Sequence, residues 1–287
     1  MAAAVGSRVG VRTFAEGVAL VTGGASGIGA ALGRDLARRG ALVVLADRDG
    51  DGARAEAGRI AAAGGRAEAV TLDVRDAAAV EARVAGVFAR HGRLDHLFNN
   101  AGIGVGGEVR HLTLDVWRDA VEVNLMGVVH GVQAAWPRMI EQGFGHVVNT
   151  ASSAAFGPGA MTAPYAATKV AVVALSRALR VEGARHGVRA SVVCPGVVRT
   201  AILENGGRYG RISQVDAGEI AAMWERLRPM DADAFARRTL DDVARNRAVI
   251  VHPAWWRVLR FLNGVAPSLL DTLSRLALAR FQARRGR

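Results

Sequence analysis

Short runs of apolar residues recur along the chain, and several of them show no alternation of apolar and polar positions. Continuous Val, Leu and Ile runs of this kind are typical of strands in a parallel sheet that is covered on both faces. The sequence therefore predicts about seven strands, within VALVTGG (18–24), ALVVLAD (41–47), EAVTLDV (68–74), LDHLFNNAG (94–102), GHVVNTAS (145–152), VRASVVCPG (188–196) and AVIVHP (248–253).

Longer Ala-rich stretches separate these runs, and each is long enough for a crossover helix. Repeated strand–helix–strand units predict an α/β fold, a doubly wound parallel sheet of the Rossmann type with helices on both faces. In such a sheet the ligand crevice lies at the carboxyl ends of the strands. The helices are expected within 27–39, 50–63, 76–90, 113–140 and 164–186.

One domain over residues 16–254 is the simplest organisation, because no low-complexity linker and no internal repeat interrupts it. We expect residues 1–15 to be a flexible lead-in and not a signal peptide, since they lack an apolar core followed by a cleavage site. Residues 255–287 form a basic C-terminal extension.

The composition limits the class of protein. Of the 287 residues 51 % are hydrophobic, which is enough for a sizeable core. The one cysteine, Cys194, excludes an intrachain disulfide and fits a reducing compartment, and its buried type of strand favours a core position over a nucleophile. No run of about 18 uncharged apolar residues appears, so no membrane-spanning helix is expected. The seven histidines show no metal-ligand spacing, and we expect no metal site.

The net charge of +11 is concentrated near the C-terminus. Residues 236–287 contain 11 Arg and 3 Asp, which gives +8, and the rest of the chain has 26 basic and 23 acidic residues, which gives +3. A nearly neutral body with a basic tail makes nucleic acid a weak candidate for a partner.

A glycine-rich turn, TGGASGIG, directly follows the first predicted strand and precedes a helical pattern. Gly23, Gly27 and Gly29 are spaced G-x-x-x-G-x-G. Glycines at such a turn let backbone N–H groups approach a pyrophosphate at a helix N-terminus. The same cluster can also serve turn geometry alone.

The second predicted strand ends in Asp47, 18 residues after Gly29. A carboxylate at this position accepts hydrogen bonds from the ribose hydroxyls of adenosine and repels a 2′-phosphate, which favours NAD over NADP. Arg48 follows at once and could instead hold a 2′-phosphate. We weigh Asp47 above Arg48.

The only lysine in the chain, Lys169, lies four residues after Tyr165, which is one of two tyrosines. Residues at i and i+4 share one side of a helix. Lysine is a compact charge on a flexible stem, whereas arginine is a wide planar fork, so a site that needs a narrow ammonium beside a phenol would reject arginine.

Together these features resemble the short-chain dehydrogenase/reductase family, over about residues 18–200 and with the motifs in the family's order. The resembling stretches are TGGASGIG, LDV with Asp73 and Val74, NNAG with Asn100, Ala101 and Gly102, NLMG with Asn124, the Ser152, Tyr165 and Lys169 set, and PGVVRT with Pro195, Val198 and Thr200. Ser26 and Ile28 lie within the cofactor turn.

The resemblance implies a role for each of these residues. Tyr165 would be the general acid/base, although a free tyrosine with a pKa near 10 is a poor base at neutral pH. A nearby ammonium, from Lys169, and an oxidised nicotinamide both favour the phenolate. Lys169 would also bind the nicotinamide ribose, Ser152 would hold the substrate oxygen, and Asn124 would hold a water in a relay from Lys169 to solvent. Ser153 is off the family spacing and is expected to be in support only.

In this family the irregular region at 201–233 usually forms the substrate lid. Its apolar members suggest a lipophilic alcohol or ketone, although any one of them could pack on the sheet instead: Ile202, Leu203, Tyr209, Ile212, Met223, Trp224, Leu227 and Met230.

The C-terminal extension departs from a common family pattern, in which the chain ends soon after the last strand. It is rich in arginine, and Leu270, Leu273, Ala277 and Phe281 fall at helical spacing. We favour packing on the body or on another subunit. Contact with an anionic membrane surface is the second possibility, and nucleic acid is the third.

The first hypothesis is an NAD(H)-dependent oxidoreductase that interconverts a lipophilic secondary alcohol, of steroid, terpenoid or lipid type, and its ketone. The alternatives are an NADPH-dependent carbonyl reductase and a non-catalytic nucleotide-sensing or membrane-docked binding protein. The complete set of proton-transfer residues argues against the last of these. We expect a cytoplasmic homodimer or homotetramer, with possible peripheral membrane contact.

Overall fold

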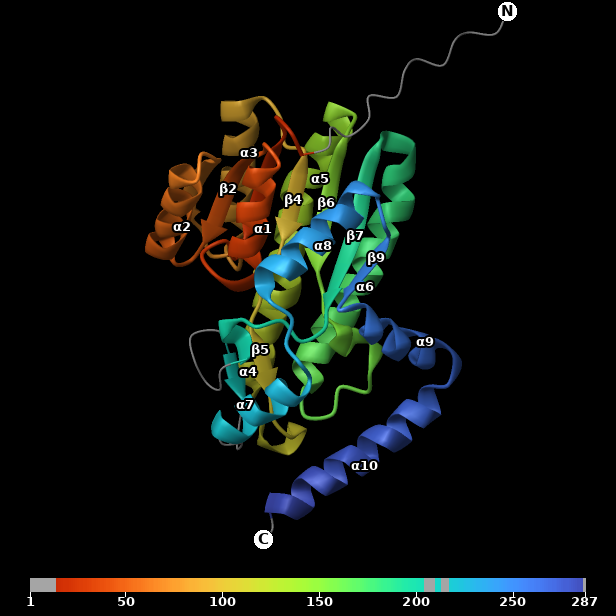
Figure 1. Cartoon of the computed structure of the whole chain (residues 1–287). Helices are drawn as coiled ribbons and strands as arrows, with labels where there is room; N and C mark the ends of the chain where they lie inside the picture. The colour runs from red at the N-terminus through yellow and green to blue at the C-terminus, as the bar shows by residue number, and fades with distance from the viewer. Residues whose placement is uncertain (1–13, 204–209, 213–216, 286–287) are drawn as a thin grey trace, which may run out of the picture.

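A seven-stranded parallel sheet lies at the centre of the computed structural model, which describes residues 14–203, 210–212 and 217–285. The strand order is β3-β2-β1-β4-β6-β7-β9 (Figure 1). The strands are β1 Val18–Thr22, β2 Leu42–Asp47, β3 Arg66–Thr71, β4 His96–Asn99, β6 Gly145–Thr150, β7 Val188–Pro195 and β9 Val249–His252. The predicted Rossmann-like sheet is confirmed. Because β1 leads outward to β2 and β3 before the chain returns to β4, the order reverses between β1 and β4, which is where such sheets bind ligands.

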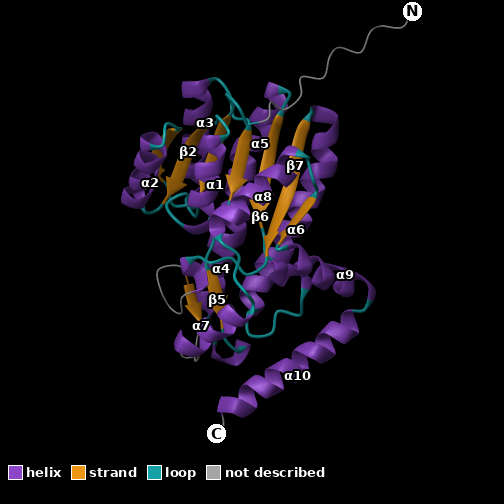
Figure 2. Cartoon of the chain, viewed as in Figure 1, coloured by secondary structure: helices purple, strands orange, loops and turns teal. Residues whose placement is uncertain are grey.

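Helices cover both faces of the sheet (Figure 2). One hydrophobic cluster joins the sheet to α1 Gly27–Arg38, α2 Gly50–Ala62 and α8 Ala232–Ala244. A second cluster on the other face joins it to α3 Ala77–His91, α5 Gly127–Gln142 and α6 Ala163–Gly183. Burial on both faces explains why the strand sequences are continuously apolar.

The stretch predicted as one helix over 113–140 is divided in the structure. It consists of α4 Leu114–Val121, a π-helical turn at Glu122–Met126 and then α5. A π-helical turn inside an α-helix is uncommon and is frequent at functional sites. Here it contains Asn124, whose side chain is fully buried.

A smaller group of elements lies beyond the carboxyl ends of the strands, in the lower part of Figure 1. It includes α4, α7 Ala217–Arg226 and a parallel pair formed by β5 Gly104–Gly106 and β8 Gly210–Ile212.

Short 3₁₀ turns occur at several places along the described chain. They are η1 Val109–His111, η3 Ser153–Phe156, η4 Ala184–His186, η5 Ala201–Leu203 and η6 Ala254–Trp256. The sequence did not predict β5, β8 or these turns.

After β9 the chain continues through η6 into α9 Arg257–Val265 and α10 Pro267–Arg285. Of the face predicted from helical spacing, Leu270 is buried, whereas Leu273 and Ala277 are exposed. The side chain of Phe281 lies outside the described residues. Helix α10 runs across the lower end of the molecule and stands away from the sheet (Figure 1). Among the helices described, none is long and apolar enough to span a bilayer.

Candidate active site

The glycine-rich turn between β1 and α1 has a backbone that only glycine forms easily. Gly23 and Gly27 have φ angles of 69° and 54°, in the left-handed region. A Cβ atom on Gly29 would lie 2.0 Å from the carbonyl oxygen of Gly23, so no larger residue fits there. The turn brings backbone N–H groups at the start of α1 to the crevice, where they can bind a phosphate.

Asp47, at the end of β2, holds this turn in place. Its buried carboxylate accepts hydrogen bonds from the backbone N–H of Ala25 at 3.1 Å and of Asp49 at 2.9 Å. Each carboxylate oxygen has further acceptor capacity for a ligand. Arg48 is exposed. Hydrogen bonds from Arg75, helped by the charge of Arg48, hold the pKa of Asp73 below its usual value.

The segment after β4 is tied to the end of β1 through Thr22. The Thr22 hydroxyl accepts from the backbone N–H of Asn100 at 3.0 Å and of Ala101 at 3.1 Å. The Asn100 side-chain amide donates to the Thr22 carbonyl at 3.1 Å. These bonds fix the two strand ends that flank the crevice.

Asn124 fixes the next residues of the same segment. Its Oδ1 atom accepts from the backbone N–H of Ile103 at 2.8 Å, and its Nδ2 atom donates to the Ile103 carbonyl at 3.0 Å. A Cβ atom on Gly102 would lie 3.1 Å from Asn124 Oδ1 and 3.5 Å from Lys169 Nζ. Asn124 thus lies directly behind the cavity wall, and its role in a water relay stays a prediction.

Ser152 follows β6 and begins the turn η3. Its hydroxyl oxygen accepts from the backbone N–H of Ala154 at 3.1 Å. That bond leaves the hydroxyl proton available for a second partner. Ser153 is also buried and lines the same cavity.

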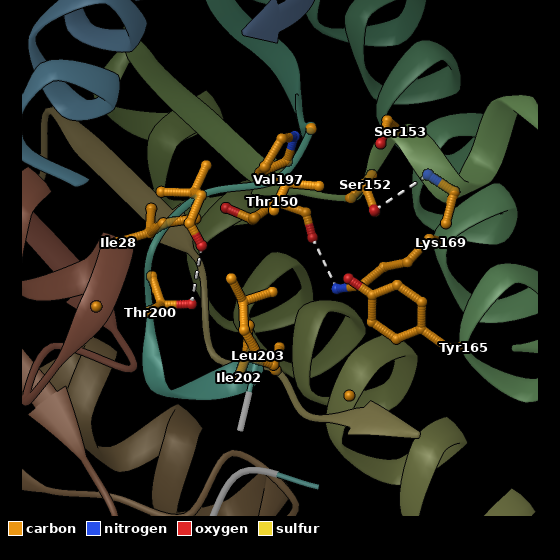
Figure 3. Close-up of a pocket in the computed structure, with 18 of the residues that line it drawn as sticks. Ile28, Thr150, Ser152, Ser153, Tyr165, Lys169, Val197, Thr200, Ile202 and Leu203 are labelled. Carbon is orange, nitrogen blue, oxygen red and sulfur yellow. Dashed lines mark hydrogen bonds between the residues drawn. The ribbon is translucent and has the colours of Figure 1, made fainter. Parts of the chain in front are cut away.

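Tyr165 and Lys169 lie one turn apart in the first half of α6. Lys169 is buried, and its Nζ atom donates to the Thr150 carbonyl at 3.0 Å (Figure 3). Burial lowers the pKa of Lys169 to about 8. Burial raises the pKa of Tyr165, and a hydrogen bond with Ser152 opposes that rise. Ser152, Tyr165 and Lys169 therefore lie together at the wall of one cavity.

A cavity of about 340 Å³ connects these features. Thirteen predicted cofactor residues line it: Gly23, Ser26, Gly27, Ile28, Asp47, Asn100, Ala101, Gly102, Tyr165, Lys169, Pro195, Val198 and Thr200. Gly29, Arg48, Asp73, Val74 and Asn124 are not in this lining, although Gly29 and Asn124 lie directly behind it.

Apolar side chains form the outer wall of the cavity. Ile202, Leu203 and Trp224 come from the predicted lid region (Figure 3 labels the first two). Tyr209 and the Ile212 side chain lie outside the described residues. The lining does not include Met223, Leu227 or Met230, and Met230 instead pairs with Val198 as an isolated β-bridge.

The C-terminal segment also contributes to this wall, through Trp256 and Leu259. The Trp256 ring packs on Gly196, where an added Cβ atom would lie 2.2 Å from two ring atoms. Sequence reasoning missed both residues. The only sequence signal for them was the unusual Trp-Trp pair directly after the last strand.

The remaining reactive groups do not suggest other chemistry. Cys194 is buried in the core, as predicted, and burial raises the pKa of its thiol to about 12. Within 14–203, 210–212 and 217–285, no group of three His, Cys, Asp or Glu side chains is arranged to hold a metal ion.

The chain belongs to the short-chain dehydrogenase family, whose model matches residues 17–208. A 1-deoxy-11-beta-hydroxypentalenate dehydrogenase from Streptomyces exfoliatus is 39 % identical over 244 residues, which cover 79 % of this chain and 88 % of that protein.

Two solved structures show the same fold. A short-chain dehydrogenase/reductase from Burkholderia phymatum, in complex with NAD, has a TM-score of 0.77 at 32 % identity, covering 86 % of this chain and 93 % of that one. A protein from Beutenbergia cavernae, with NADP bound at low occupancy, has a TM-score of 0.74 at 32 % identity, covering 85 % and 98 %.

The chain is therefore an NAD(P)-dependent oxidoreductase that acts on CH–OH groups and the corresponding ketones. Its residues fit a nicotinamide dinucleotide. The positive φ angles at Gly23 and Gly27, and the absence of space for a Cβ atom at Gly29, create a backbone cradle that would bind the pyrophosphate.

Proposed function

We propose that the protein is an NAD(H)-dependent dehydrogenase of a lipophilic secondary alcohol, of steroid, terpenoid or lipid type, and its ketone. One observation carries the proposal. The Ser152, Tyr165 and Lys169 group lies in the same cavity as Asp47 and the glycine-rich turn, and the other walls are mostly apolar.

Tyr165 is assigned the proton transfer. In oxidation the alcohol oxygen gives its proton to the Tyr165 phenolate as the C=O bond forms, and in reduction the phenol returns that proton. A nicotinamide cofactor bound in this cavity would supply the hydride chemistry, as the hydride acceptor in oxidation and the hydride donor in reduction. Ser152 holds the substrate oxygen beside the phenol.

Lys169 provides a positive charge close to the phenol of Tyr165. Its ammonium is held by the Thr150 carbonyl close to the phenol, and a positive charge there favours phenolate. Ordinary burial has the opposite effect and raises the pKa of Tyr165. The ammonium and the Ser152 hydroxyl are therefore the groups that make Tyr165 usable as a base.

Asp47 supports NAD as the cofactor. It is buried and lines the cavity, so a 2′-phosphate placed beside it would meet an unscreened like charge. The alternative is an NADPH-dependent carbonyl reductase in which Arg48 holds the phosphate. The Burkholderia relative with NAD and the Beutenbergia relative with NADP illustrate that this fold accepts both nucleotides.

The apolar wall supports the substrate class. Ile202, Leu203, Trp224, Trp256 and Leu259 would bind a hydrocarbon skeleton far better than a polyol, because burying apolar surface is favourable by about 25 cal/mol per Å². The Streptomyces exfoliatus relative acts on 1-deoxy-11-beta-hydroxypentalenate. We further expect a homodimer or homotetramer in the cytoplasm.

Two measurements on the purified protein test this proposal. The first titrates NADH and NADPH separately and follows nicotinamide fluorescence, and we expect tighter binding of NADH. The second supplies NAD⁺ with a panel of bicyclic and long-chain secondary alcohols and with sugar alcohols as the matched polar set. We expect absorbance at 340 nm to rise with the lipophilic alcohols. Turnover of the sugar alcohols alone would exclude the proposed substrate class, and tighter binding of NADPH would favour the reductase.

A further inference from the structure

Helix α9 has two apolar faces with different surroundings. Leu259, on the inner face, lines the substrate cavity together with Trp256 just before the helix. Val258, Phe261 and Val265, at i, i+3 and i+7, are 59 %, 67 % and 63 % exposed. Exposed apolar residues at this spacing form a continuous stripe. One short helix therefore connects the cavity wall to an apolar surface that the described chain leaves uncovered.

Helix α10 presents a mostly polar side to the gap beside the body, and although Leu270 is buried, three other leucines of the helix are exposed. The gap between α10 and the loop at Pro158 and Ala160 is lined from α10 by one apolar residue, Leu278, and by the polar residues Ser268, Asp271, Thr272, Ser274 and Arg275. Leu269, Leu273 and Leu276, at i, i+4 and i+7, are about half exposed. These leucines lie on the side of the helix opposite the gap. A soluble surface helix normally has the reverse arrangement, with its apolar stripe on the core.

The charge of this segment indicates what covers the apolar stripes. We call residues 254–285 the C-terminal arm. It contains six Arg and one Asp, which gives +5, and Arg257, Arg260, Arg275 and Arg280 are exposed. If a second copy docked through its own arm, two surfaces that each carry a net charge of +5 would face and repel each other. An anionic bilayer brings the opposite charge and an apolar interior together.

We propose that the C-terminal arm lies in the surface of an anionic lipid bilayer, with the stripes of α9 and α10 in the boundary between headgroups and acyl chains. Trp255, which is half exposed and stacked on Trp256 at 4.3 Å between ring centres, is at the start of the arm. Tryptophan prefers this boundary because its ring is apolar and its N–H is polar.

The position of the arm beside the cavity gives the membrane contact a role in substrate delivery. This step rests on the proposed function. Leu259 and Trp256 belong to the arm and to the cavity wall at once. A lipophilic alcohol dissolved in the bilayer would reach the cavity along α9 without crossing water. The arm would then present the substrate of the enzyme as well as bind the membrane.

Vesicle flotation of the full-length protein tests the inference. The probes are phosphatidylcholine vesicles with and without about 30 mol % phosphatidylglycerol, at low salt and at about 0.5 M NaCl. We expect the wild type to float with the anionic vesicles only, and less at high salt. The double variant Phe261→Ser/Leu273→Ser should lose at least about tenfold in bound fraction, since it removes two exposed apolar anchors.

A matched control keeps the test specific. Leu114 and Val181 are apolar residues outside the arm that are more exposed than Phe261 and Leu273, and Leu114→Ser/Val181→Ser should float like the wild type. Failure of the wild type to float with anionic vesicles would overturn the inference, as would equal binding by the arm variant. A wild type that stays off vesicles and sediments as a dimer, while the arm variant sediments as a monomer, would assign the stripes to a second copy.

The outcome is separable from that of the proposed function. Oxidation of the bicyclic and long-chain secondary alcohols of the panel above with NAD⁺ is measured on the same proteins without vesicles. Flotation without alcohol oxidation would leave the membrane contact standing and remove the dehydrogenase. Oxidation without flotation would do the reverse.

Discussion

The Nζ atom of Lys169 lies 5.5 Å from the centre of the Tyr165 ring, one helical turn further along α6. The ammonium is buried and donates a hydrogen bond to the Thr150 carbonyl at 3.0 Å. A guanidinium in this place would need more space and more acceptors, because it is a planar group with five donors. The geometry therefore explains why a chain with 36 arginines has lysine here.

Lys169 should be visible in the pH dependence of stability. Burial lowers its pKa from 10.5 to about 8 in the folded protein. Between these two values the unfolded chain holds a proton that the folded chain has lost, so the free energy of unfolding rises with pH in this window. Relative to Lys169→Met, the wild type should gain about 3 kcal/mol between pH 8 and 10.5. Chemical denaturation at several pH values measures this, and a constant difference would contradict the low pKa.

Ser152 and Ser153 form a matched pair, because both are buried and line the cavity, but only Ser152 hydrogen-bonds with Tyr165. Ser152→Ala should lower kcat by roughly 10²-fold or more, since it removes a donor to the reacting oxygen. In the wild type this hydrogen bond keeps the pKa of Tyr165 down. Its loss should therefore also move the pH profile of oxidation to higher pH. Ser153→Ala should change kcat by less than about threefold. Equal losses in the two variants would show that general packing, and not the hydroxyl of Ser152, is responsible.

Asp47 is expected to select the nucleotide. Asp47→Ala removes both the ribose acceptor and the charge that repels a 2′-phosphate, so the ratio of NADPH to NADH affinity should rise by at least about tenfold. The loss of two hydrogen bonds to backbone N–H groups should also lower the melting temperature. Arg48→Ala is the control and should leave the binding of NADH unchanged. If Arg48→Ala weakens NADPH strongly and Asp47→Ala alters neither nucleotide, then Arg48 is the selector.

The ring of Trp256 packs directly against Gly196. Gly196→Ala would put a Cβ atom 2.2 Å from the indole ring, so we expect the ring to be displaced and the melting temperature to fall. The KM for a lipophilic alcohol should rise with little change in NADH affinity. In Gly264→Ala an added Cβ meets no atom within 4 Å, and this helical position should be stabilised by about 0.5–1 kcal/mol. An unchanged KM and stability in Gly196→Ala would separate Trp256 from the substrate wall.

The sheet could be predicted because its strands are buried on both faces. Val43 to Ala46 and Val147 to Val148 are almost fully inaccessible, and such burial requires the continuous apolar runs that mark the strands in the sequence. The sequence has no comparable apolar run at β5 or β8. Each is three residues long and begins with glycine, and the pairing of Gly104–Gly106 with Gly210–Ile212 depends on contacts between distant segments.

The site residues also fall into two groups, those that the sequence indicates and those that only the structure reveals. The residues of the glycine-rich turn and of the Tyr165 and Lys169 pair are local in sequence, so their motifs could be recognised through the resemblance to the family. The π-helical turn at Glu122–Met126 has an uninterrupted helical pattern, and nothing in the sequence marks the change of hydrogen bonding. Trp256 and Leu259 could not be assigned to the cavity, because only the path of the chain after β9 brings them to it.

The most direct test of the account is the turnover of a Tyr165→Phe variant. Phenylalanine keeps the ring and removes the one group assigned to proton transfer, so NADH binding, followed by nicotinamide fluorescence, should stay within about threefold of the wild type. The rate of NADH formation from NAD⁺ and a lipophilic secondary alcohol should fall by roughly 10²–10⁴-fold. Full turnover in this variant, with normal NADH binding, would contradict the assignment of Tyr165 as the general acid/base.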